Sequence, residues 1–132
     1  MADTFEFELV SPERRLVAMA ASAVQIPGST GDLTAMPLHA PTITTLRPGV
    51  LKVEGAGGEK SFVVTGGFAE ITPEAASVLA ERAMPVEDAT APVFDALLDE
   101  ARKAAEAATP EARDAADKLV ADMQALRSAV GV

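Results

Sequence analysis

The sequence lacks several residue types on which common protein chemistries depend. It contains no cysteine, tryptophan or tyrosine, and its one histidine is His39. The absence of cysteine excludes disulfide scaffolds, thiolate metal sites and cysteine nucleophiles, and a single imidazole disfavours a zinc site. With 132 residues, the chain can bury a hydrophobic core without such cross-links.

Positive charge and long hydrophobic runs are also scarce. Eleven Lys and Arg stand against 20 Asp and Glu, which gives a net charge of −9. A nucleic-acid-binding protein needs a clustered basic face, so we expect no nucleic-acid partner. No apolar run approaches the roughly 18 residues of a bilayer span, and the N-terminal stretch is acidic and alternating rather than signal-like. We therefore expect a soluble, cytoplasmic protein.

The first half of the chain is patterned as β-strands. Phe5, Phe7 and Leu9 alternate with polar residues, which is typical of a strand with one buried face. Glycine- and proline-bearing turns follow at short intervals, and this spacing is typical of a sandwich or flattened barrel. Further strands are expected within residues 16–26, 42–46, 50–53, 61–65 and 68–72, with residues 55–59 as a hairpin loop.

Residues 24–51 are the most informative stretch. Turns at Pro27-Gly28, between Met36-Pro37 and Ala40-Pro41, and at Pro48-Gly49 separate short runs rich in Thr, Ile, Leu and Val. The spacing leaves no room for a helix and predicts a meander of short strands.

Residues 72–83 allow two interpretations. Thr72 and Pro73 could cap and open a helix. The same residues could instead form a turn before a last strand at residues 77–80. We favour the strand, because it completes the sheet and the helical pattern is short.

The second half predicts two helices. The first runs from Pro92 to Ala107, where apolar residues recur at helical intervals without glycine or internal proline. The second starts at Thr109-Pro110-Glu111, with a hydroxyl N-cap, a first-turn proline and an acid near the positive end of the helix dipole, and it ends near Gly131. Its expected apolar face consists of Ala112, Ala115, Ala116, Leu119, Met123 and Leu126.

These patterns define two domains with a boundary at Met84-Pro85. Residues 1–85 form an all-β N-terminal domain, and residues 86–132 form an α-helical hairpin. Alanine dominates the apolar stripe of the hairpin, so the helices approach closely but bury little area per residue. We expect the hairpin to be marginally stable alone.

Catalytic chemistry has little support in the sequence. His39 lies in a turn without a nucleophile–base pattern around it, and the glycine groups at residues 55–58 and 66–67 match neither a Walker loop nor a dinucleotide fingerprint. Asp99 and Arg102 have the spacing of an exposed i,i+3 ion pair on a helix. In this interpretation the pair stabilises the helix and has no role in binding or catalysis.

Several motifs, taken in order, carry a resemblance to a known family. They are Gly31-Asp32-Leu33, Pro37-Leu38-His39-Ala40-Pro41, Pro48-Gly49, Gly66-Gly67-Phe68-Ala69-Glu70 and Val78-Leu79-Ala80-Glu81, followed by the helix pair. In this order and at these separations the chain resembles the epsilon subunit of bacterial F-type, proton-translocating ATP synthases over nearly its whole length.

The resemblance implies a ten-stranded β-sandwich followed by two antiparallel helices, with residues 77–80 as strand. It also implies a non-catalytic role in the central stalk, where the subunit links gamma to the membrane rotor ring and couples rotation to ATP synthesis. Gly31, Asp32 and Leu33 would form a loop facing the rotor-ring c subunits. Asp32 is expected to be solvated in the isolated protein. Ser11, His39 and Thr42 would contact gamma.

The resemblance extends to regulation and location. Asp99 and Arg102 match part of an ATP-binding motif on the first helix, so the chain would require no cofactor but could bind a regulatory ATP, with Arg113 and Arg127 available on the second helix. The C-terminal helices would reach the alpha and beta subunits and regulate hydrolysis weakly. The protein would be peripheral on the cytoplasmic face of the inner membrane, attached only through the complex. A different hypothesis is a free-standing acidic adaptor that binds a partner protein through its sandwich edge.

Overall fold

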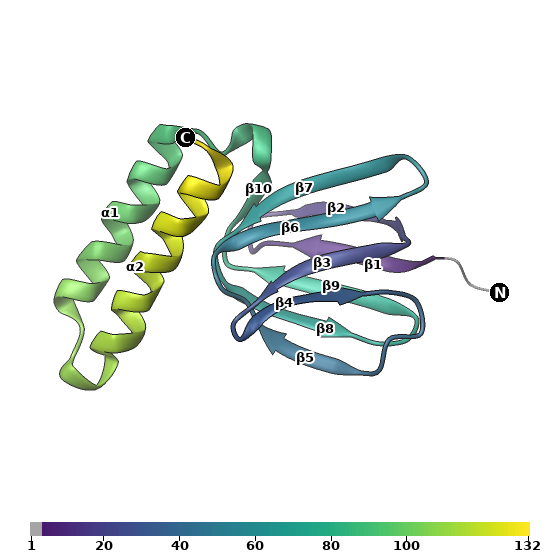
Figure 1. Cartoon of the computed structure of the whole chain (residues 1–132), viewed down its shortest axis with the longest axis horizontal. Helices are drawn as coiled ribbons and strands as arrows, with labels where there is room; N and C mark the ends of the chain where they lie inside the picture. Colours follow the sequence, from purple (N-terminus) through teal and green to yellow (C-terminus); the bar gives the residue numbers. More distant parts are fainter. Residues whose placement is uncertain (1–3) are drawn as a thin grey trace. The chain divides into compact units, whose positions relative to one another are not determined.

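The computed structural model describes residues 4–132, and the chain divides into two compact units, residues 1–85 and residues 86–132 (Figure 1). The described part of the first unit is a β-sandwich of two five-stranded sheets. We call the sheet with strand order β2-β1-β9-β8-β5 sheet A, and the sheet with order β10-β7-β6-β3-β4 sheet B. The ten strands are β1 (Phe5–Val10), β2 (Arg15–Ala21), β3 (Ala23–Gly28), β4 (Gly31–Ala35), β5 (Thr42–Thr45), β6 (Gly49–Gly55), β7 (Gly58–Val64), β8 (Gly67–Ile71), β9 (Ala75–Ala80) and β10 (Ala83–Pro85). The expected all-β sandwich followed by two helices is confirmed.

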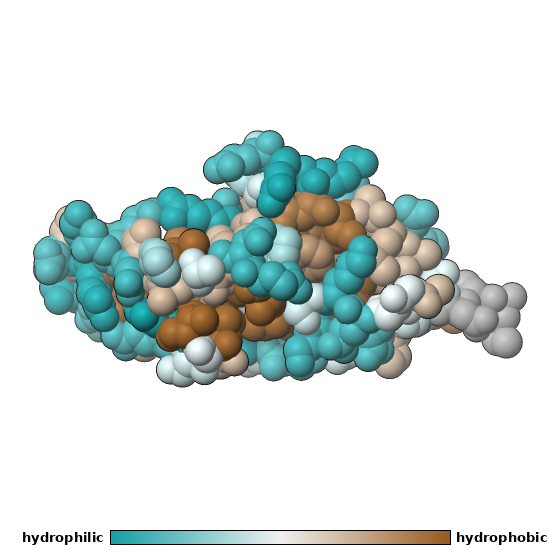
Figure 2. Space-filling view, turned by 90° about the horizontal axis from the view of Figure 1, so that it is seen from above, coloured by the Kyte–Doolittle hydropathy of each residue, from teal (hydrophilic) through white to brown (hydrophobic). Residues whose placement is uncertain are grey.

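The core of the sandwich lies between the two sheets and follows the period-2 alternation of the strands. Phe5, Phe7 and Leu9 of β1 are buried as expected, and Leu51 and Val53 of β6 face them from sheet B. Burying a side chain of this size stabilises the fold by about 1.5–3 kcal/mol. On the outside, Figure 2 shows mostly hydrophilic residues with hydrophobic patches between them, and several large hydrophobic residues do reach solvent.

The predicted meander between residues 24 and 51 is wrong. Strands β3 and β4 form a hairpin in sheet B, but β5 belongs to sheet A and β6 returns to sheet B. Within residues 24–51 the chain therefore crosses twice between the sheets. Residues 36–41 make the first crossing, and Leu46–Pro48 make the second. Two prolines and a left-handed Leu38 (φ 70°) turn the first connection out of its sheet.

Two turn assignments are also corrected. Pro27 and Gly28 are the last residues of β3, and Gly31–Leu33 form the start of β4 rather than a loop. The turn consists of Ser29 and Thr30, because Gly28 pairs with Gly31 in the ladder and closes a two-residue hairpin.

The ambiguous segment after Thr72 is a strand. Strand β9 pairs in parallel with β1 and antiparallel with β8, so its backbone groups are satisfied on both sides. Thr72 forms the preceding turn, where its backbone N–H donates to Ala75 O at 2.8 Å and its Oγ1 accepts from Ala75 N at 3.1 Å. The short β10 that follows was not predicted.

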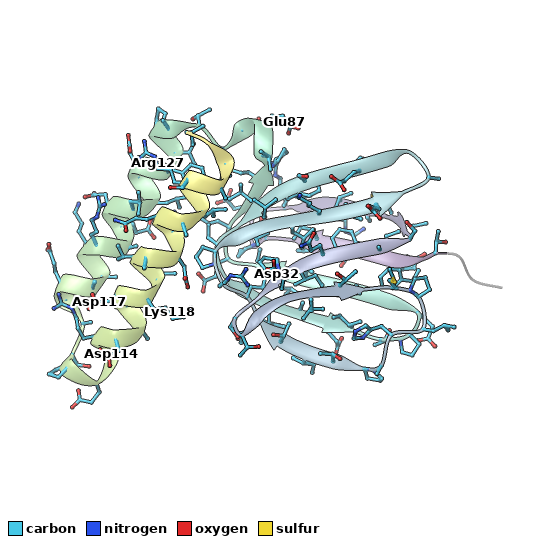
Figure 3. The ribbon with its side chains drawn as sticks, in the orientation of Figure 1. Asp32, Glu87, Asp114, Asp117, Lys118 and Arg127 are labelled. Atoms are coloured by element: carbon cyan, nitrogen blue, oxygen red, sulfur yellow. The ribbon has the colours of Figure 1, made fainter. Side chains whose placement is uncertain are left out.

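The second unit consists of a 3₁₀ turn (Val86–Asp88), α1 (Ala91–Ala107) and α2 (Pro110–Val130). Thr109 is the N-cap of α2 as predicted, but its hydroxyl makes no capping hydrogen bond. Charged residues cover α2, among them Asp114, Asp117, Lys118 and Arg127 in Figure 3.

The predicted apolar face of α2 is only partly buried. Met123 and Leu126 are buried, whereas Ala112, Ala115 and Leu119 are exposed and Ala116 is half-buried. The two helices are antiparallel, so the exposed half of α2 lies beside the end of α1 where the buried residues are Ala101 and Ala105. Alanine side chains are too short to cover much of a neighbouring helix.

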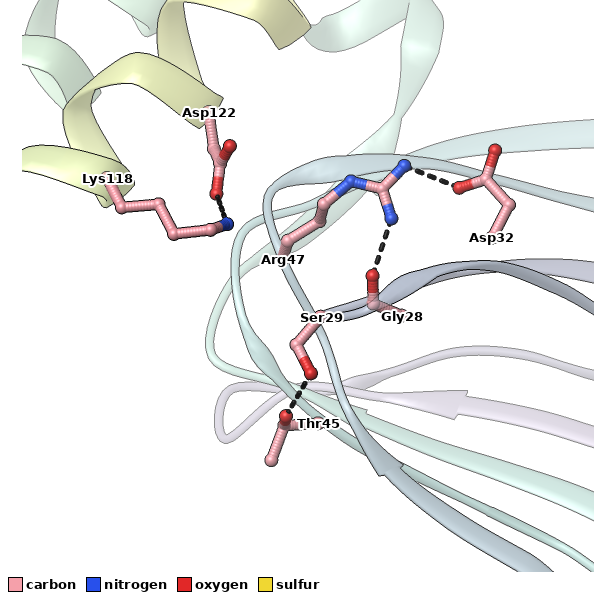
Figure 4. A network of polar contacts seen from close by, with 7 residues as sticks. All are labelled: Gly28, Ser29, Asp32, Thr45, Arg47, Lys118 and Asp122. Atoms are coloured by element: carbon pink, nitrogen blue, oxygen red, sulfur yellow. Dashed lines mark hydrogen bonds and ion pairs between the residues drawn. The ribbon is translucent and has the colours of Figure 1, made fainter. Parts of the chain in front are cut away.

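Arg47 ties the second crossing to the β3–β4 hairpin (Figure 4). Its guanidinium donates to Gly28 O and to Asp32 Oδ1, both at 2.5 Å, and its backbone N–H donates to Pro27 O at 3.1 Å. Beside it, Thr45 Oγ1 donates to Ser29 Oγ at 2.7 Å. One arginine therefore satisfies groups from both strands of the hairpin.

Gly67 should be sensitive to any added side chain. Its φ is 114°, and a Cβ there would overlap the carbonyl oxygen of Leu79 on the neighbouring strand. We expect Gly67→Ala to lower the free energy of unfolding by about 3 kcal/mol or more in urea denaturation, because backbone strain and a steric clash combine. Gly58 has a similar φ of 109° with open space around it, so Gly58→Ala should cost only about 1 kcal/mol. Equal losses in both variants would show that the contact with Leu79 is unimportant.

Arg47 should matter more for stability than Asp32. We expect Arg47→Ala to lower the free energy of unfolding by about 1–2 kcal/mol, because it leaves Gly28 O without its charged donor. Asp32→Asn should cost less than about 1 kcal/mol, since Asp32 is half-exposed and its ion pair is partly screened. Arg14→Ala, an exposed arginine in the β1–β2 turn, is the control and should stay within about 0.5 kcal/mol. A loss from Arg47→Ala no larger than that of the control would contradict this role.

Candidate functional site

The outer face of sheet A carries an apolar row across three strands. Val10, Leu79, Phe68 and Thr45 are register partners on β1, β9, β8 and β5. Phe68 and Leu79 are each 46% exposed, which is unusual for side chains of this size. We call Val10, Phe68 and Leu79 the apolar row.

A shallow hollow of about 560 Å³ lies at the apolar row. Its lining includes Ser11, Pro12 and Glu81 beside the three apolar side chains. Ser11 starts the tight β1–β2 turn, where its backbone N–H donates to Arg14 O at 2.9 Å and its hydroxyl donates to the same oxygen at 3.3 Å. The predicted partner residue Ser11 therefore borders an apolar hollow.

His39 and Thr42 lie at the other end of sheet A. His39 Nδ1 lies 2.7 Å from Ala40 O, and Thr42 Oγ1 donates to the same carbonyl at 3.0 Å. Because a carbonyl oxygen only accepts, this contact requires the proton on Nδ1. The imidazole ring of His39 therefore makes a hydrogen bond within its own turn.

Leu38 precedes His39 and has a strained backbone conformation. It has a positive φ of 70° although it is not glycine, and it is 76% exposed. Its backbone N–H donates to Pro73 O at 2.9 Å, which holds the turn in place. A strained, exposed leucine of this kind is typical of a binding residue rather than of a core residue.

The structure does not bring Ser11 together with His39 and Thr42. Strands β1 and β5 run in the same direction, and Ser11 follows the end of β1 whereas Thr42 begins β5. Val10 and Thr42 are separated by three strand spacings across the sheet and by three residues along the strand direction. Together these two displacements correspond to a distance of about 17 Å. A single partner that touches both ends must cover the outer face of sheet A, including Ile43, which is 72% exposed.

Asp32 lies at the same end of the sandwich as Ser11. The β3–β4 turn is joined to the end of β5 by a hydrogen bond from Ser29 N to Thr45 O at 2.8 Å. The expectation that Asp32 is simply solvated is wrong, because Arg47 pairs with its carboxylate. Gly31 is exposed and Leu33 is half-buried, and both stand in β4 rather than in a loop.

The helix residues Asp99 and Arg102 do not form the predicted i,i+3 ion pair. Asp99 Oδ2 pairs instead with Lys103 Nζ at 3.0 Å, one residue further along α1. Arg113 pairs with Asp117 at 3.2 Å and Arg127 with Asp95 at 2.5 Å, so both arginines of α2 already have partners.

Two features of the candidate site were missed from the sequence. Phe68 and Leu79 stand in the outward-facing phase of their strands, in step with Glu70 and Ser77, and this phase could have marked them as exposed. Arg47 gives no such signal, because its partners follow from the crossing between sheets.

Among residues 4–132 we find no cluster of three potential metal ligands. No helix in that range is long and apolar enough to cross a bilayer.

Comparison with known proteins gives consistent matches. A family profile described as "ATP synthase, Delta/Epsilon chain, beta-sandwich domain" matches residues 4–86. ATP synthase epsilon chains are 57% identical in Ruegeria sp. (strain TM1040), over 96% of each chain, and 54% identical in Rhodobacter capsulatus, over 100% of each. These relatives give no support to a free-standing adaptor.

Solved structures share the fold. A chain of the Euglena gracilis mitochondrial ATP synthase superposes with a TM-score of 0.75 at 22% identity, covering 98% of this chain and 83% of that one. A chain from the central stalk and c-ring of the Tetrahymena thermophila enzyme gives 0.70 at 15% identity, covering 96% of each. The profile match over the sandwich and the near-full-length identity to epsilon chains together establish that the chain belongs to the delta/epsilon family of ATP synthase subunits.

Proposed function

We propose that the chain is the epsilon subunit in the central stalk of a proton-translocating F-type ATP synthase, where it links gamma to the rotor ring. The observation that carries this proposal is the identity of more than half of all residues to ATP synthase epsilon chains over nearly the full length of both chains. The role is mechanical, so it requires rigid contact surfaces and neither a catalytic centre nor a cofactor. The protein would lie on the cytoplasmic face of the inner membrane as part of the complex.

The outer face of sheet A is the proposed surface for gamma. Phe68 and Leu79 provide exposed apolar area at its centre, and binding energy in interfaces concentrates in such anchors. Glu70 stands next to the apolar row on the same face, whereas the nearby Glu8 already pairs with Arg15 at 3.2 Å, so a partner with a basic residue beside an apolar patch would complement Glu70. Ser11 and the turn at His39–Thr42 would then be the two ends of one contact surface.

The β3–β4 end is the proposed surface for the c subunits of the rotor ring. Arg47 holds the Asp32 carboxylate and the hairpin backbone in one arrangement, with Asp32 still half-exposed. A held carboxylate loses less conformational entropy on contact than a mobile one. This arrangement supports a coupling contact that must transmit torque.

The helical unit is proposed to regulate hydrolysis weakly. It has ten acidic and five basic residues, a net charge of −5, and like charge opposes its approach to an acidic surface of the alpha and beta subunits. A regulatory ATP on Asp99 and Arg102 would have to compete with the ion pairs of Asp99, Arg113 and Arg127.

Leu79→Asp tests the gamma surface. A charge at the centre of the apolar row should weaken co-purification with tagged gamma at least tenfold, while thermal unfolding changes little because Leu79 is half-exposed. Leu119→Asp makes the same chemical change at an exposed site of α2 and should leave gamma binding within about twofold. Equal recovery of both variants with gamma would remove sheet A from the interface.

Deletion of residues 86–132 tests the regulatory role. The ATPase rate of the assembled enzyme at physiological salt should rise less than about twofold, because charge repulsion keeps the helical unit from inhibiting strongly. The truncated protein should still assemble and give a β-sheet circular dichroism spectrum. A severalfold rise in the rate would show that local helix contacts outweigh the net charge.

A further inference from the structure

The helical hairpin is held together unevenly along its length. Large buried side chains occur at the end away from the connecting loop, where α1 supplies Phe94, Leu97 and Leu98 and α2 supplies Met123 and Leu126. Toward the loop, α1 buries only Ala101 and Ala105, and no residue of α2 before Met123 is buried. Removing a large apolar side chain from water stabilises a contact far more than removing an alanine. The last turns of α2 therefore provide most of the attachment.

One ion pair spans the two helices at that same end. Arg127 Nη1 donates to Asp95 Oδ1 at 2.5 Å, from the last turn of α2 to the second turn of α1. Three further ion pairs of the hairpin join residues four apart on one helix, namely Asp99–Lys103, Arg113–Asp117 and Lys118–Asp122. Such pairs stabilise a single helix but do nothing to hold two helices together.

Arg127 also organises the end of α2. Its Nε donates to Val132 O at 3.0 Å, and its backbone carbonyl accepts from Gly131 N at 3.0 Å and from Val132 N at 3.4 Å. Gly131 adopts the left-handed conformation that ends a helix in this way. With 29% of its side chain exposed, Arg127 is more enclosed than any other paired base of the hairpin. Its side chain is thus held in place before it reaches Asp95.

We propose that the Asp95–Arg127 pair is a latch that closes the hairpin at its open end and sets how often α2 separates from α1. When the pair breaks, the last turn of α2 loses its ion pair with α1 and is held by the apolar contacts of Met123 and Leu126, while the alanine contacts toward the loop add little. Opening then releases α2 as a whole helix. This inference concerns the isolated chain and does not rest on the proposed function.

Hydrogen exchange on the full chain tests the latch. Amides of residues 110–130 should exchange about two- to fivefold faster in Asp95→Asn and in Arg127→Gln than in the wild type, which is the range for a partly exposed ion pair. Lys118→Gln is the matched control, since it removes one positive charge from the same helix and breaks only an intrahelical pair. Its amides should stay within about 1.5-fold of the wild type.

A double-mutant cycle separates the latch from general helix effects. Asp95 lies near the start of α1 and Arg127 near the end of α2, so each charge also interacts with its own helix dipole. Those separate effects cancel in the cycle. The acceleration of exchange in the combined variant should therefore be smaller than the product of the accelerations in the two single variants, by the same two- to fivefold factor. Arg127→Lys should exchange more slowly than Arg127→Gln, because it restores part of the protection. Multiplicative single effects, or equal acceleration by Lys118→Gln, would overturn the latch.

Discussion

The β-sandwich depends on the two successive crossings between its sheets that the chain makes between Ala35 and Gly49. Strand β5 alone joins sheet A in that interval, although β4 and β6 on either side of it belong to sheet B. A short strand at a sheet edge pairs on one side only and contributes few hydrogen bonds. Side-chain ties therefore hold it. Arg47, Ser29 and Thr45 connect the second crossing to the β3–β4 hairpin, and the backbone N–H of Leu46 donates to Gly67 O at 2.9 Å.

These ties shape the two proposed contact surfaces. They fix Asp32 at the end of the sandwich, and they set the position of β5 beside β8, which completes the outer face of sheet A. The apolar row on that face carries Phe68 and Leu79 at the cost of exposing them to water. A protein whose work is to transmit force gains from this arrangement, because rigid strands present the anchors with little loss of entropy on binding.

The helical unit follows a different physical principle. Alanine side chains form much of the contact between α1 and α2, so the two helices lie close together but bury little apolar area. Ion pairs within each helix supply part of the remaining stability. We expect such a unit to have low local stability, so that it opens without unfolding of the whole protein. The Asp95–Arg127 pair is then in a position to influence the opening, since it lies where the large buried side chains are concentrated.

The sequence by itself determined the elements and the family. Alternation in β1 predicted which of its residues are buried, the Thr109-Pro110 start located α2 to the residue, and the ordered motifs identified the family because they are local patterns. Only the tertiary structure decided the rest. Pairing with β1 and β8 decided between the two interpretations that the sequence allowed for residues 75–80, in favour of the strand, and pairing with β3 made residues 31–33 a strand. The partners of Arg47 and Arg127 were likewise set by tertiary contacts between residues distant in sequence, through a crossing between sheets for Arg47 and through the packing of α2 on α1 for Arg127. Local spacing carries no record of such contacts, since the free energy that selects them arises only when the sheets and helices meet.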